Sequence, residues 1–281
     1  MAKYLVTGGE GFIGGNILSK VEGGAYDIKS GFDVLNKEIL LDKAKDFDGI
    51  FHCAAKISVP ESFLLPEEYF KNNVEGTNCV AFVANELDQK IVFSSSAAVY
   101  GESDIAVVEN FDLNPKSPYA ENKLAGENIL RDSGGRHIIL RYFNVYGPGQ
   151  SPEYAGVITF FILNALSNKD LIIFGNGEQV RDFIFVEDVA HANVLAMNYE
   201  NKEFEIFNIS SGIKTSIKEL AEIIIKLTNS NSKIIFQDAR EGDIFFSQGS
   251  PQKAKDVLGW KARTSLEEGL LKTIAYYKSK L

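Results

Sequence analysis

The sequence predicts an α/β protein, built as a doubly wound parallel sheet with a smaller lobe from the C-terminal part of the chain. Three observations support this prediction. The chain begins with a short apolar run at 4–6, a glycine-rich turn and then apolar spacing suited to a helix. Short apolar runs typical of buried strands recur around 50, 92 and 139, and helical patterns follow them. The 281 residues are enough for one large domain with a small lobe.

The composition limits the classes of partner and compartment. Hydrophobic residues make up 45% of the chain and charged residues 24%, which is ordinary for a globular protein. The net charge of −9 argues against nucleic acid or an anionic membrane as the main partner. The apolar runs are too short to span a bilayer, and the N-terminus enters a strand directly rather than a signal peptide. Cys53 and Cys79 lie in apolar surroundings and the three histidines are far apart, so we expect buried thiols, a cytoplasmic protein and no metal site.

The glycine-rich turn is the first candidate site. Its glycines let the backbone turn tightly and approach a phosphate, while the helix that starts beside them offers free N–H groups and the positive end of its dipole. This order of strand, turn and helix is typical of a dinucleotide site. The stretch from Thr7 to Gly14 resembles the start of extended short-chain dehydrogenase/reductases, the family of nucleotide-sugar epimerases and dehydratases. The cofactor-binding residues expected in this stretch are Gly8, Gly11, Phe12, Ile13 and Gly14.

The segment after this turn is short for the resembled family. The first helix is predicted over about 12–21. A second strand could occupy 25–30 and the end of a third 31–36. We therefore expect one strand–helix unit to be shortened or missing before His52.

This short segment also bears on the choice of cofactor. By resemblance, Asp33 and Val34 would contact the adenine of the dinucleotide. Asp27 is another candidate for the acidic residue that binds the adenosine ribose, and Lys29 with Ser30 could hold a 2′-phosphate. NAD is the preferred cofactor, with NADP left open.

The next predicted strand runs into small residues. Ala54 and Ala55 would let the backbone lie against the cofactor, as in the H-x-A-A segment of the resembled family. Asn73 belongs to an N-V-x-G-T stretch that is also similar to the family, just before a predicted helix over 76–88. We count Asn73 among the cofactor residues, although a buried Asn of this kind also commonly ties strand ends together.

The catalytic candidates are serines at a strand end and a Tyr–Lys pair on a helix. Ser94 and Ser96 follow the predicted strand at 91–93, at the end where parallel sheets bind ligands. Tyr119 and Lys123 are four residues apart at the start of a predicted helix, which places both side chains on one face. A phenol is a poor base at neutral pH, and a neighbouring ammonium group lowers its pKa. Tyr119 could then remove a hydroxyl proton while Ser96 holds the reacting oxygen.

The resemblance assigns roles to these residues. The serine, tyrosine and lysine match the family's catalytic triad, in which the lysine also holds the nicotinamide ribose. Dehydratases of the family carry an Asp-Glu pair after the hydroxyl residue, but this chain has Ala97 and Ala98 there, which favours epimerisation over dehydration. Asp104 and Glu109, in the following loop, are expected to be exposed to solvent. The further cofactor contacts that the resemblance implies are Ser94, Tyr119, Lys123 and Phe143.

The second half of the chain carries the other candidate substrate residues. Around Phe143 and Asn144 the sequence is similar to the family's R-Y-F-N-x-Y-G-P, in which the Asn meets the substrate diphosphate and the Phe edge lies by the nicotinamide. Arg181 belongs to a stretch that resembles nucleotide-sugar enzymes, and a guanidinium group can bind phosphate bidentately. Arg240 and Asp243 match the family's R-x-G-D, which implies a second phosphate ligand and a ribose or loop-fixing residue.

One position bears on the sugar itself. Ser247 falls where the family places a gate beside the sugar, and a small residue there would leave room for an N-acetyl group. The resemblance extends from about residue 3 to residue 277, with five motifs in the expected order. The elements predicted for this half are helices over 157–166, 216–227 and 265–277 and strands over 171–174 and 207–210.

We expect residues 1–150 to form a dinucleotide-binding domain with the catalytic residues. Residues 151–281 would form mainly a nucleotide-sugar lobe, with segments around 180–210 returning to the first domain. The resemblance implies a 4-epimerase of a UDP-hexose or UDP-N-acetylhexosamine that uses bound NAD and a 4-keto intermediate. Two alternatives stay open, an NADPH-dependent reductase of a 4-keto nucleotide sugar and a non-catalytic nucleotide-sugar-binding protein. The apolar faces of 76–88 and 119–131 could pair two subunits of a homodimer, as in family dimers.

Overall fold

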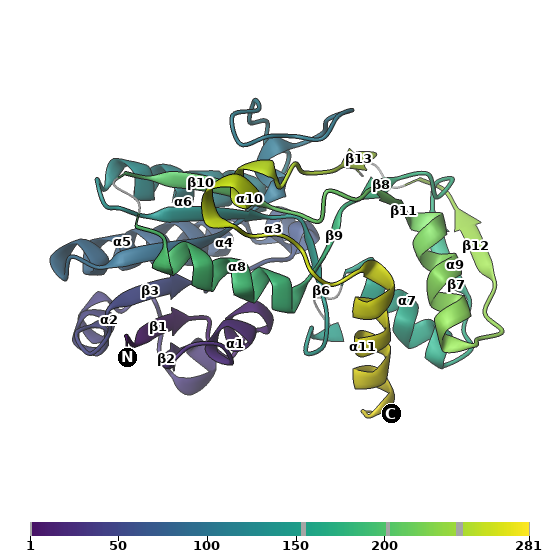
Figure 1. The fold of residues 1–281 in the computed structure, drawn as a ribbon, viewed down its shortest axis with the longest axis horizontal. Helices are drawn as coiled ribbons and strands as arrows, with labels where there is room; N and C mark the ends of the chain where they lie inside the picture. Colours follow the sequence, from purple (N-terminus) through teal and green to yellow (C-terminus); the bar gives the residue numbers. More distant parts are fainter. Residues whose placement is uncertain (1, 153–155, 201–202, 240–243, 281) are drawn as a thin grey trace.

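The computed structural model describes residues 2–152, 156–200, 203–239 and 244–280, and it confirms the predicted fold class. The central sheet is parallel throughout, and its strands run toward a second, smaller lobe (Figure 1). Helices cover both faces of this sheet. In spatial order the six strands are β10 (Glu205–Ile209), β5 (Ile138–Tyr142), β4 (Lys90–Ser96), β3 (Gly49–His52), β1 (Tyr4–Thr7) and β2 (Gly23–Tyr26).

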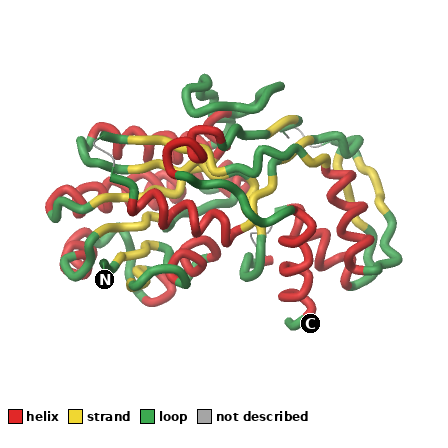
Figure 2. Tube along the Cα trace, in the orientation of Figure 1, coloured by secondary structure: helices red, strands yellow, loops and turns green. Residues whose placement is uncertain are grey.

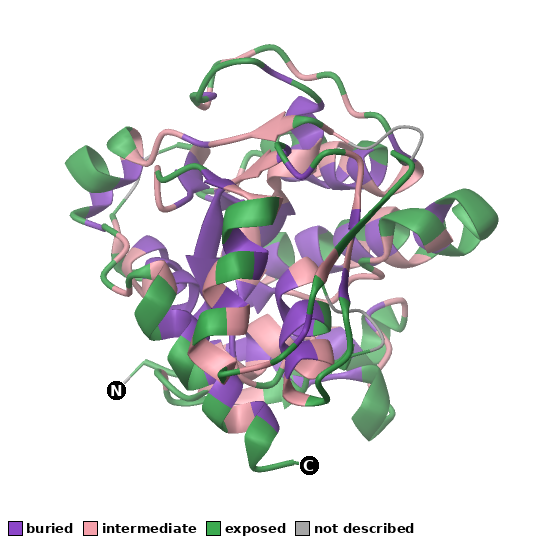
Figure 3. Ribbon diagram, turned by 90° about the vertical axis from the view of Figure 1, so that its right-hand side faces the viewer, coloured by how far each residue is buried: buried purple, intermediate pink, exposed green. Residues whose placement is uncertain are grey.

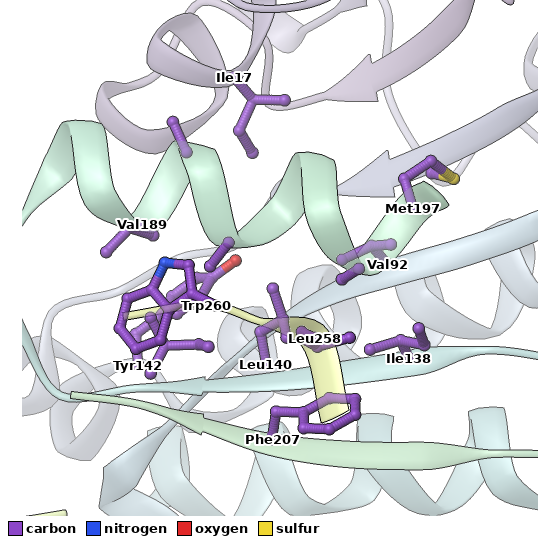
Figure 4. Packing of buried hydrophobic residues seen from close by; sticks show 14 of the residues in the cluster. Ile17, Val92, Ile138, Leu140, Tyr142, Val189, Met197, Phe207, Leu258 and Trp260 are labelled. Carbon is purple, nitrogen blue, oxygen red and sulfur yellow. The ribbon is translucent and has the colours of Figure 1, made fainter. Parts of the chain in front are cut away.

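Alternating side chains divide the apolar residues of the sheet between two cores. Ile91 and Ile139 join the core under α2 (Lys37–Ala44), α5 (Gly76–Glu86) and α6 (Pro118–Asp132). Their neighbours Val92 and Leu140 join the core under α1 (Phe12–Leu18), α8 (Val186–Asn198) and α10 (Gln252–Leu258). In this second core Trp260 packs between α8 and the strands (Figure 4). A sheet covered on both faces needs apolar residues at successive positions, which explains the uninterrupted apolar runs of the sequence.

The strand order confirms that one strand–helix unit is missing. In the usual doubly wound order, 3-2-1-4-5-6, a third strand lies beyond the second. Here β2 is the edge strand and β3 pairs directly with β1. The strand expected at 25–30 lies earlier, over Gly23–Tyr26, and the strand end expected at 31–36 is wrong. That segment follows a short 3-10 turn (Ile28–Ser30) and leads into α2, which the Asn36 side chain caps by accepting from the Ile39 N–H.

The second lobe has its own apolar core, to which Phe161, Ile224 and Ile274 contribute. Three helices and a parallel strand pair surround it. These are α7 (Val157–Leu166), α9 (Ile217–Thr228), α11 (Leu266–Lys278), β7 (Leu171–Phe174) and β12 (Ile234–Gln237). Figure 3 views the molecule from this side and shows the outer helix faces exposed over a buried interior.

Short strands join the two lobes. The pair β6 (Asn144–Tyr146) and β9 (Phe183–Phe185) is parallel, and the chain then returns through α8 and β10 to the central sheet. A small sheet consists of β11 (Thr215–Ser216), β8 (Val180–Arg181) and β13 (Phe246–Ser247). Loops make up much of this region in Figure 2. The remaining elements lie between β3 and α6: α3 (Val59–Leu64), α4 (Pro66–Phe70), a π-helical turn (Lys71–Glu75) and the 3-10 helix η3 (Ala97–Tyr100).

Candidate active site

The glycine-rich turn leaves no room for side chains at its tightest point. A Cβ atom at Gly14 would lie 2.2 Å from the carbonyl oxygen of Gly8, and Gly8 itself has a φ of +68°. Gly11 is the N-cap residue of α1, so the cap supplies no side chain to the N–H groups of the first turn. Phe12 and Ile13 follow within that turn. The result is an open backbone surface at a helix N-terminus, which suits a pyrophosphate.

An acidic residue closes one side of this turn. Asp27 is buried at the end of β2, where its carboxylate accepts hydrogen bonds from the backbone N–H groups of Glu10 and Lys29, each at 3.0 Å. The Lys29 ammonium donates to the Glu10 carbonyl oxygen at 3.1 Å, and the Ser30 hydroxyl donates to the Glu10 carboxylate. Both candidates for a 2′-phosphate are therefore engaged with Glu10. A negative charge at Asp27 also disfavours a further phosphate, so the site fits NAD better than NADP.

The other predicted cofactor residues lie on neighbouring loops. Asp33 accepts a hydrogen bond from the Leu35 N–H at 2.9 Å, and Val34 is buried in the core under α2 and α5. Ala54 lies against the turn, since a Cβ atom at Gly8 would be 2.8 Å from the Ala54 nitrogen. Their contacts with a cofactor stay predictions.

Asn73 has a visible structural role. The side-chain oxygen of Asn73 accepts a hydrogen bond from the Lys56 N–H at 2.8 Å, and its side-chain amide donates to the Lys56 backbone carbonyl oxygen at 2.9 Å. Asn73 thus fixes the loop that follows Ala54 and Ala55. A direct role at the cofactor is untested.

The three catalytic candidates come together at the end of β4. Ser96 ends this strand, and its hydroxyl accepts from the Ala98 N–H at 3.2 Å as η3 begins. Ser117 caps α6, so Tyr119 lies in the first turn of that helix and Lys123 one turn later. The buried Lys123 ammonium donates to the Ser94 carbonyl oxygen at 2.8 Å and lies 6.0 Å from the centre of the Tyr119 ring. The helix therefore brings a phenol and an ammonium group to the strand end that carries Ser96.

Burial is the main cause of the pKa shifts of Lys123 and Tyr119. It lowers the pKa of Lys123 to about 8, although Cys53 and Glu127 act in the opposite direction. Burial also raises the pKa of Tyr119, and a hydrogen bond with the Ser96 side chain opposes that rise. In the protein alone, the expected lowering of the Tyr119 pKa by Lys123 is absent. The Lys123 pKa of about 8 lies below the raised pKa of Tyr119, so the lysine has lost its charge before the phenol titrates.

Behind these residues lies a buried ion pair that sequence reasoning missed. The Arg141 guanidinium meets the Glu127 carboxylate at 2.6 Å and 2.9 Å, and Ser95 donates to the same carboxylate at 2.5 Å. The spacing of Lys123 and Glu127, one helical turn apart on α6, was the available indication that both face the sheet. Glu109 also differs from expectation: it is partly buried and accepts from the Asn208 N–H at 2.8 Å, whereas Asp104 is exposed as predicted.

The substrate candidates lie where the two lobes meet. Asn144 donates to the Asp182 carbonyl oxygen from its backbone and its side chain, each at 3.0 Å. Arg181 on β8 is in register with Ser247 on β13. Phe143 is buried against Tyr100, with 6.5 Å between ring centroids. Arg240 and Asp243 lie outside the described residues, so their roles stay predictions.

A second buried carboxylate, Asp182, lies among the substrate candidates. Asp182 accepts from the N–H and hydroxyl of Ser211 and from the N–H of Gly212, at 2.7 to 3.0 Å. Burial raises the pKa of Asp182 to about 6, and these hydrogen bonds oppose the rise. Asp182 thereby links β8, β9 and the loop after β10.

The ranges that the structure describes carry neither a metal-binding cluster nor a membrane-spanning helix. No group of three or more His, Cys, Asp or Glu side chains within them could hold a metal ion. No helix in the same ranges combines the length and the apolarity needed to cross a membrane.

Comparison with known proteins agrees with this arrangement. The sequence model of the NAD dependent epimerase/dehydratase family matches residues 4–210. A putative UDP-glucose 4-epimerase of Methanocaldococcus jannaschii is 39% identical over 305 residues, which cover 98% of each protein. A UDP-N-acetyl-alpha-D-glucosaminuronate decarboxylase of Bacillus cytotoxicus is 30% identical over 314 residues, again covering 98% of each.

Solved structures share the fold along the whole chain. A UDP-N-acetylglucosamine 4-epimerase from Methanobrevibacter ruminantium, in complex with UDP-N-acetylmuramic acid, superposes with a TM-score of 0.91. It is 33% identical in sequence, and the match covers 100% of this chain and 99% of that one. The likeness therefore includes both lobes.

Proposed function

The chain belongs to the NAD dependent epimerase/dehydratase family, and on that premise we propose that it is a nucleotide-sugar 4-epimerase acting on UDP-hexoses or UDP-N-acetylhexosamines. The observation that carries this proposal is the meeting of Ser96, Tyr119 and Lys123 at the end of β4, in a chain that also has the glycine-rich turn from Gly8 to Gly14. Ala97 and Ala98 occupy the positions at which a dehydratase would need acids.

The cofactor of the proposed enzyme is NAD, which the family description names. The turn from Gly8 to Gly14 would hold its pyrophosphate, and Asp27 would accept hydrogen bonds from the adenosine ribose. Lys123 would hold the nicotinamide ribose. When bound, NAD supplies the reversible two-electron oxidation of the sugar and the positive charge of its nicotinamide ring.

The chain's own residues move the proton. Tyr119 takes the proton from the C4 hydroxyl of the sugar. It returns the proton after the 4-keto sugar has rotated in the site to present its opposite face. Ser96 donates a hydrogen bond to the reacting oxygen. The Lys123 ammonium, together with the positive charge of the bound nicotinamide ring, would favour the phenolate of Tyr119.

The substrate would lie between the two lobes. Asn144, Arg181 and Arg240 are the proposed diphosphate ligands, with Asp243 at the ribose or its loop. Ser247 lies in register with Arg181, so a small side chain would border the sugar. One of the similar structures is a UDP-N-acetylglucosamine 4-epimerase, which supports the proposal that an N-acetyl group fits beside Ser247.

Two further features of the proposed enzyme are its assembly and location. The outer faces of α5 and α6 would pair two copies into a homodimer, an expectation that sedimentation would test. The two free cysteines, Cys53 and Cys79, support a cytoplasmic location.

Proton NMR of the anomeric signals tests the activity directly. The protein would be incubated with NAD and, in turn, UDP-glucose, UDP-N-acetylglucosamine, dTDP-glucose and UDP-glucuronic acid. We expect a galacto signal that approaches equilibrium without a reductant. Activity only on addition of NADPH and a 4-keto sugar would favour the reductase, and loss of carboxylate from UDP-glucuronic acid would favour a decarboxylase like the Bacillus relative.

A matched pair of tyrosine variants isolates the chemistry. Tyr119→Phe removes the proposed base and should lower kcat by about 100- to 10,000-fold. Tyr276→Phe, on α11 in the second lobe, should leave kcat unchanged. Equal rates for Tyr119→Phe and the wild type would contradict the mechanism.

A further inference from the structure

A buried ion pair joins α6, the helix that carries Tyr119 and Lys123, to β5, the strand beside β4. Glu127 on α6 and Arg141 on β5 are 0% and 1% exposed. The guanidinium contacts both carboxylate oxygens, with Nε–Oε1 at 2.9 Å and Nη2–Oε2 at 2.6 Å. A pair this deep is costly to desolvate and contributes little net stability. Its place therefore calls for an explanation other than stability.

The pair is joined to the catalytic end of β4 through Ser95. In the strand register Ser95 lies opposite Arg141. Its hydroxyl donates to Glu127 Oε1 at 2.5 Å. Ser95 lies between Ser94, whose carbonyl oxygen accepts from Lys123, and the catalytic Ser96. Two hydrogen bonds one helical turn apart thus fasten α6 to two successive residues of β4, Ser94 and Ser95, directly before Ser96.

The same pair also holds the segment that follows Ser96. Arg141 donates from Nη1 to the Tyr100 hydroxyl at 2.9 Å and to the Glu109 carbonyl oxygen at 3.1 Å. Tyr100 ends η3, and its hydroxyl donates to Asn208 on β10 at 2.7 Å. The chain on both sides of Ser96 is therefore anchored to one guanidinium–carboxylate pair.

We propose that the Glu127–Arg141 pair is the positioning device of the catalytic centre. Through Ser95 it fixes the end of β4 that carries Ser96 against the turn of α6 that carries Lys123. Neither Glu127 nor Arg141 touches substrate in this arrangement, so both are positioning residues. The inference rests on the proposed function, which assigns Ser96 and Lys123 to the reaction.

The charge of Glu127 also bears on the ammonium group. Lys123 is faced by His52 and Cys53 from the end of β3 and by Tyr119 and Glu127 on its own helix. Burial lowers the pKa of His52 to about 3, with Lys123 adding to the effect. Burial raises the pKa of the Cys53 thiol to about 11. Glu127 raises the pKa of Lys123, and it is the acidic side chain that the ion pair holds one turn away on the same helix.

A double variant removes the pair without leaving a buried charge. Glu127→Leu combined with Arg141→Met keeps similar volumes, and such replacements are often neutral for stability. The control is a double variant of the half-exposed pair of Glu205 and Lys253, with Glu205→Leu and Lys253→Met. Both proteins are compared with the wild type only after circular dichroism shows the native spectrum.

The first readout needs neither substrate nor cofactor. NMR of lysine-labelled protein follows the side-chain signal of Lys123, assigned by its absence from Lys123→Met. We expect a titration midpoint near 8 in the wild type. In Glu127→Leu/Arg141→Met the midpoint should fall, because Glu127 raises the pKa of Lys123. The control pair should leave it in place.

The second readout is steady-state epimerisation. In Glu127→Leu/Arg141→Met we expect kcat to fall by about 10- to 100-fold through misplacement of the catalytic groups. KM should stay within about twofold, because the substrate ligands are untouched. The alkaline loss of activity should move to lower pH together with the Lys123 midpoint. A merely structural pair would not shift this pH profile.

A second variant covers the case in which the double variant does not fold. Ser95→Ala keeps the ion pair and cuts its link to β4, so kcat should fall with KM and the Lys123 midpoint unchanged. The proposal is overturned if Ser95→Ala has the wild-type kcat, or if the folded double variant keeps the wild-type midpoint and kcat. If the wild type epimerises no sugar, the proposed function fails, and the Lys123 midpoint still decides the electrostatic part of this inference.

Discussion

The catalytic candidates at the end of β4, here called the catalytic side, and the substrate candidates on β8 and β13, here called the substrate side, are built differently. Each side has a buried carboxylate beside it. On the catalytic side Ser96 ends a seven-residue strand, and Glu127 behind it has the guanidinium of Arg141 as its counterion. On the substrate side Arg181 and Ser247 lie on two-residue strands, and Asp182 behind them accepts hydrogen bonds from Ser211 and from backbone N–H groups.

The two carboxylates differ in what compensates their charge. A full positive charge compensates Glu127, so removing either member of the pair leaves a buried charge without its partner. Asp182 is compensated by dipoles, and burial raises its pKa to about 6. We expect the catalytic side to respond strongly to the loss of one partner and the substrate side to respond to pH.

The largest effect should come from breaking the pair on the catalytic side. Arg141→Met leaves the Glu127 carboxylate buried without its counterion, which should lower the free energy of unfolding by about 3–5 kcal/mol. Urea denaturation at pH 7 measures this loss. The control is Arg131→Met on α6, the helix that carries Glu127, because the Arg131 guanidinium is near the surface and donates to Asn128. Equal losses in both variants would remove the contrast between the two sides.

On the substrate side, the free energy of unfolding should depend on pH through Asp182. The folded pKa of Asp182, about 6, lies above its ordinary value of 3.8, so the fold favours the protonated form. The resulting stabilisation is complete below about pH 4 and is lost as pH rises through 6, with a total of about 3 kcal/mol. Asp182→Asn should abolish this decline in urea denaturation between pH 4 and 7.

Asp104→Asn, in an exposed loop, is the control for Asp182→Asn. It should keep the wild-type dependence of the unfolding free energy on pH. If Asp182→Asn keeps that dependence as well, the substrate side is not governed by its buried carboxylate.

An intermediate effect is expected at the glycine-rich turn from Gly8 to Gly14, here called the glycine cradle. A Cβ atom at Gly14 would lie 2.2 Å from the Gly8 oxygen, so Gly14→Ala should cost about 1–3 kcal/mol of stability and weaken NAD binding. At Gly15 the nearest atom lies at 3.6 Å, and Gly15→Ala should be neutral or stabilise by up to about 1 kcal/mol. Thermal unfolding and titration calorimetry with NAD measure both variants. Identical behaviour would show that the cradle is not as tight as its geometry indicates.

The smallest effect should be selective for one class of sugar. Ser247→Tyr narrows the substrate side and should lower kcat/KM for UDP-N-acetylglucosamine by about 10-fold relative to UDP-glucose. The two substrates serve as each other's control in the NMR assay. An equal change for both would mean that Ser247 does not border the sugar, and the substrate side would then need another specificity residue.

The sheet, the glycine-rich turn and the alignment of Tyr119 with Lys123 could all be predicted from the order of residues along the chain. These depend on local rules: apolar runs form buried strands, small residues permit tight turns, and residues four apart share a helix face. The short segment before His52 likewise predicted the missing unit, since too few residues remained for it.

The meeting of polar side chains in the interior could not be predicted in this way, because it depends on how the elements pack. Glu127 and Arg141 pair because β4 and β5 are in one register and α6 docks across them. Asp182 gathers loops from distant parts of the chain. Such contacts depend on how strands and helices align in space, and a spacing along one element carries no information about the residue that a neighbouring element will place opposite it.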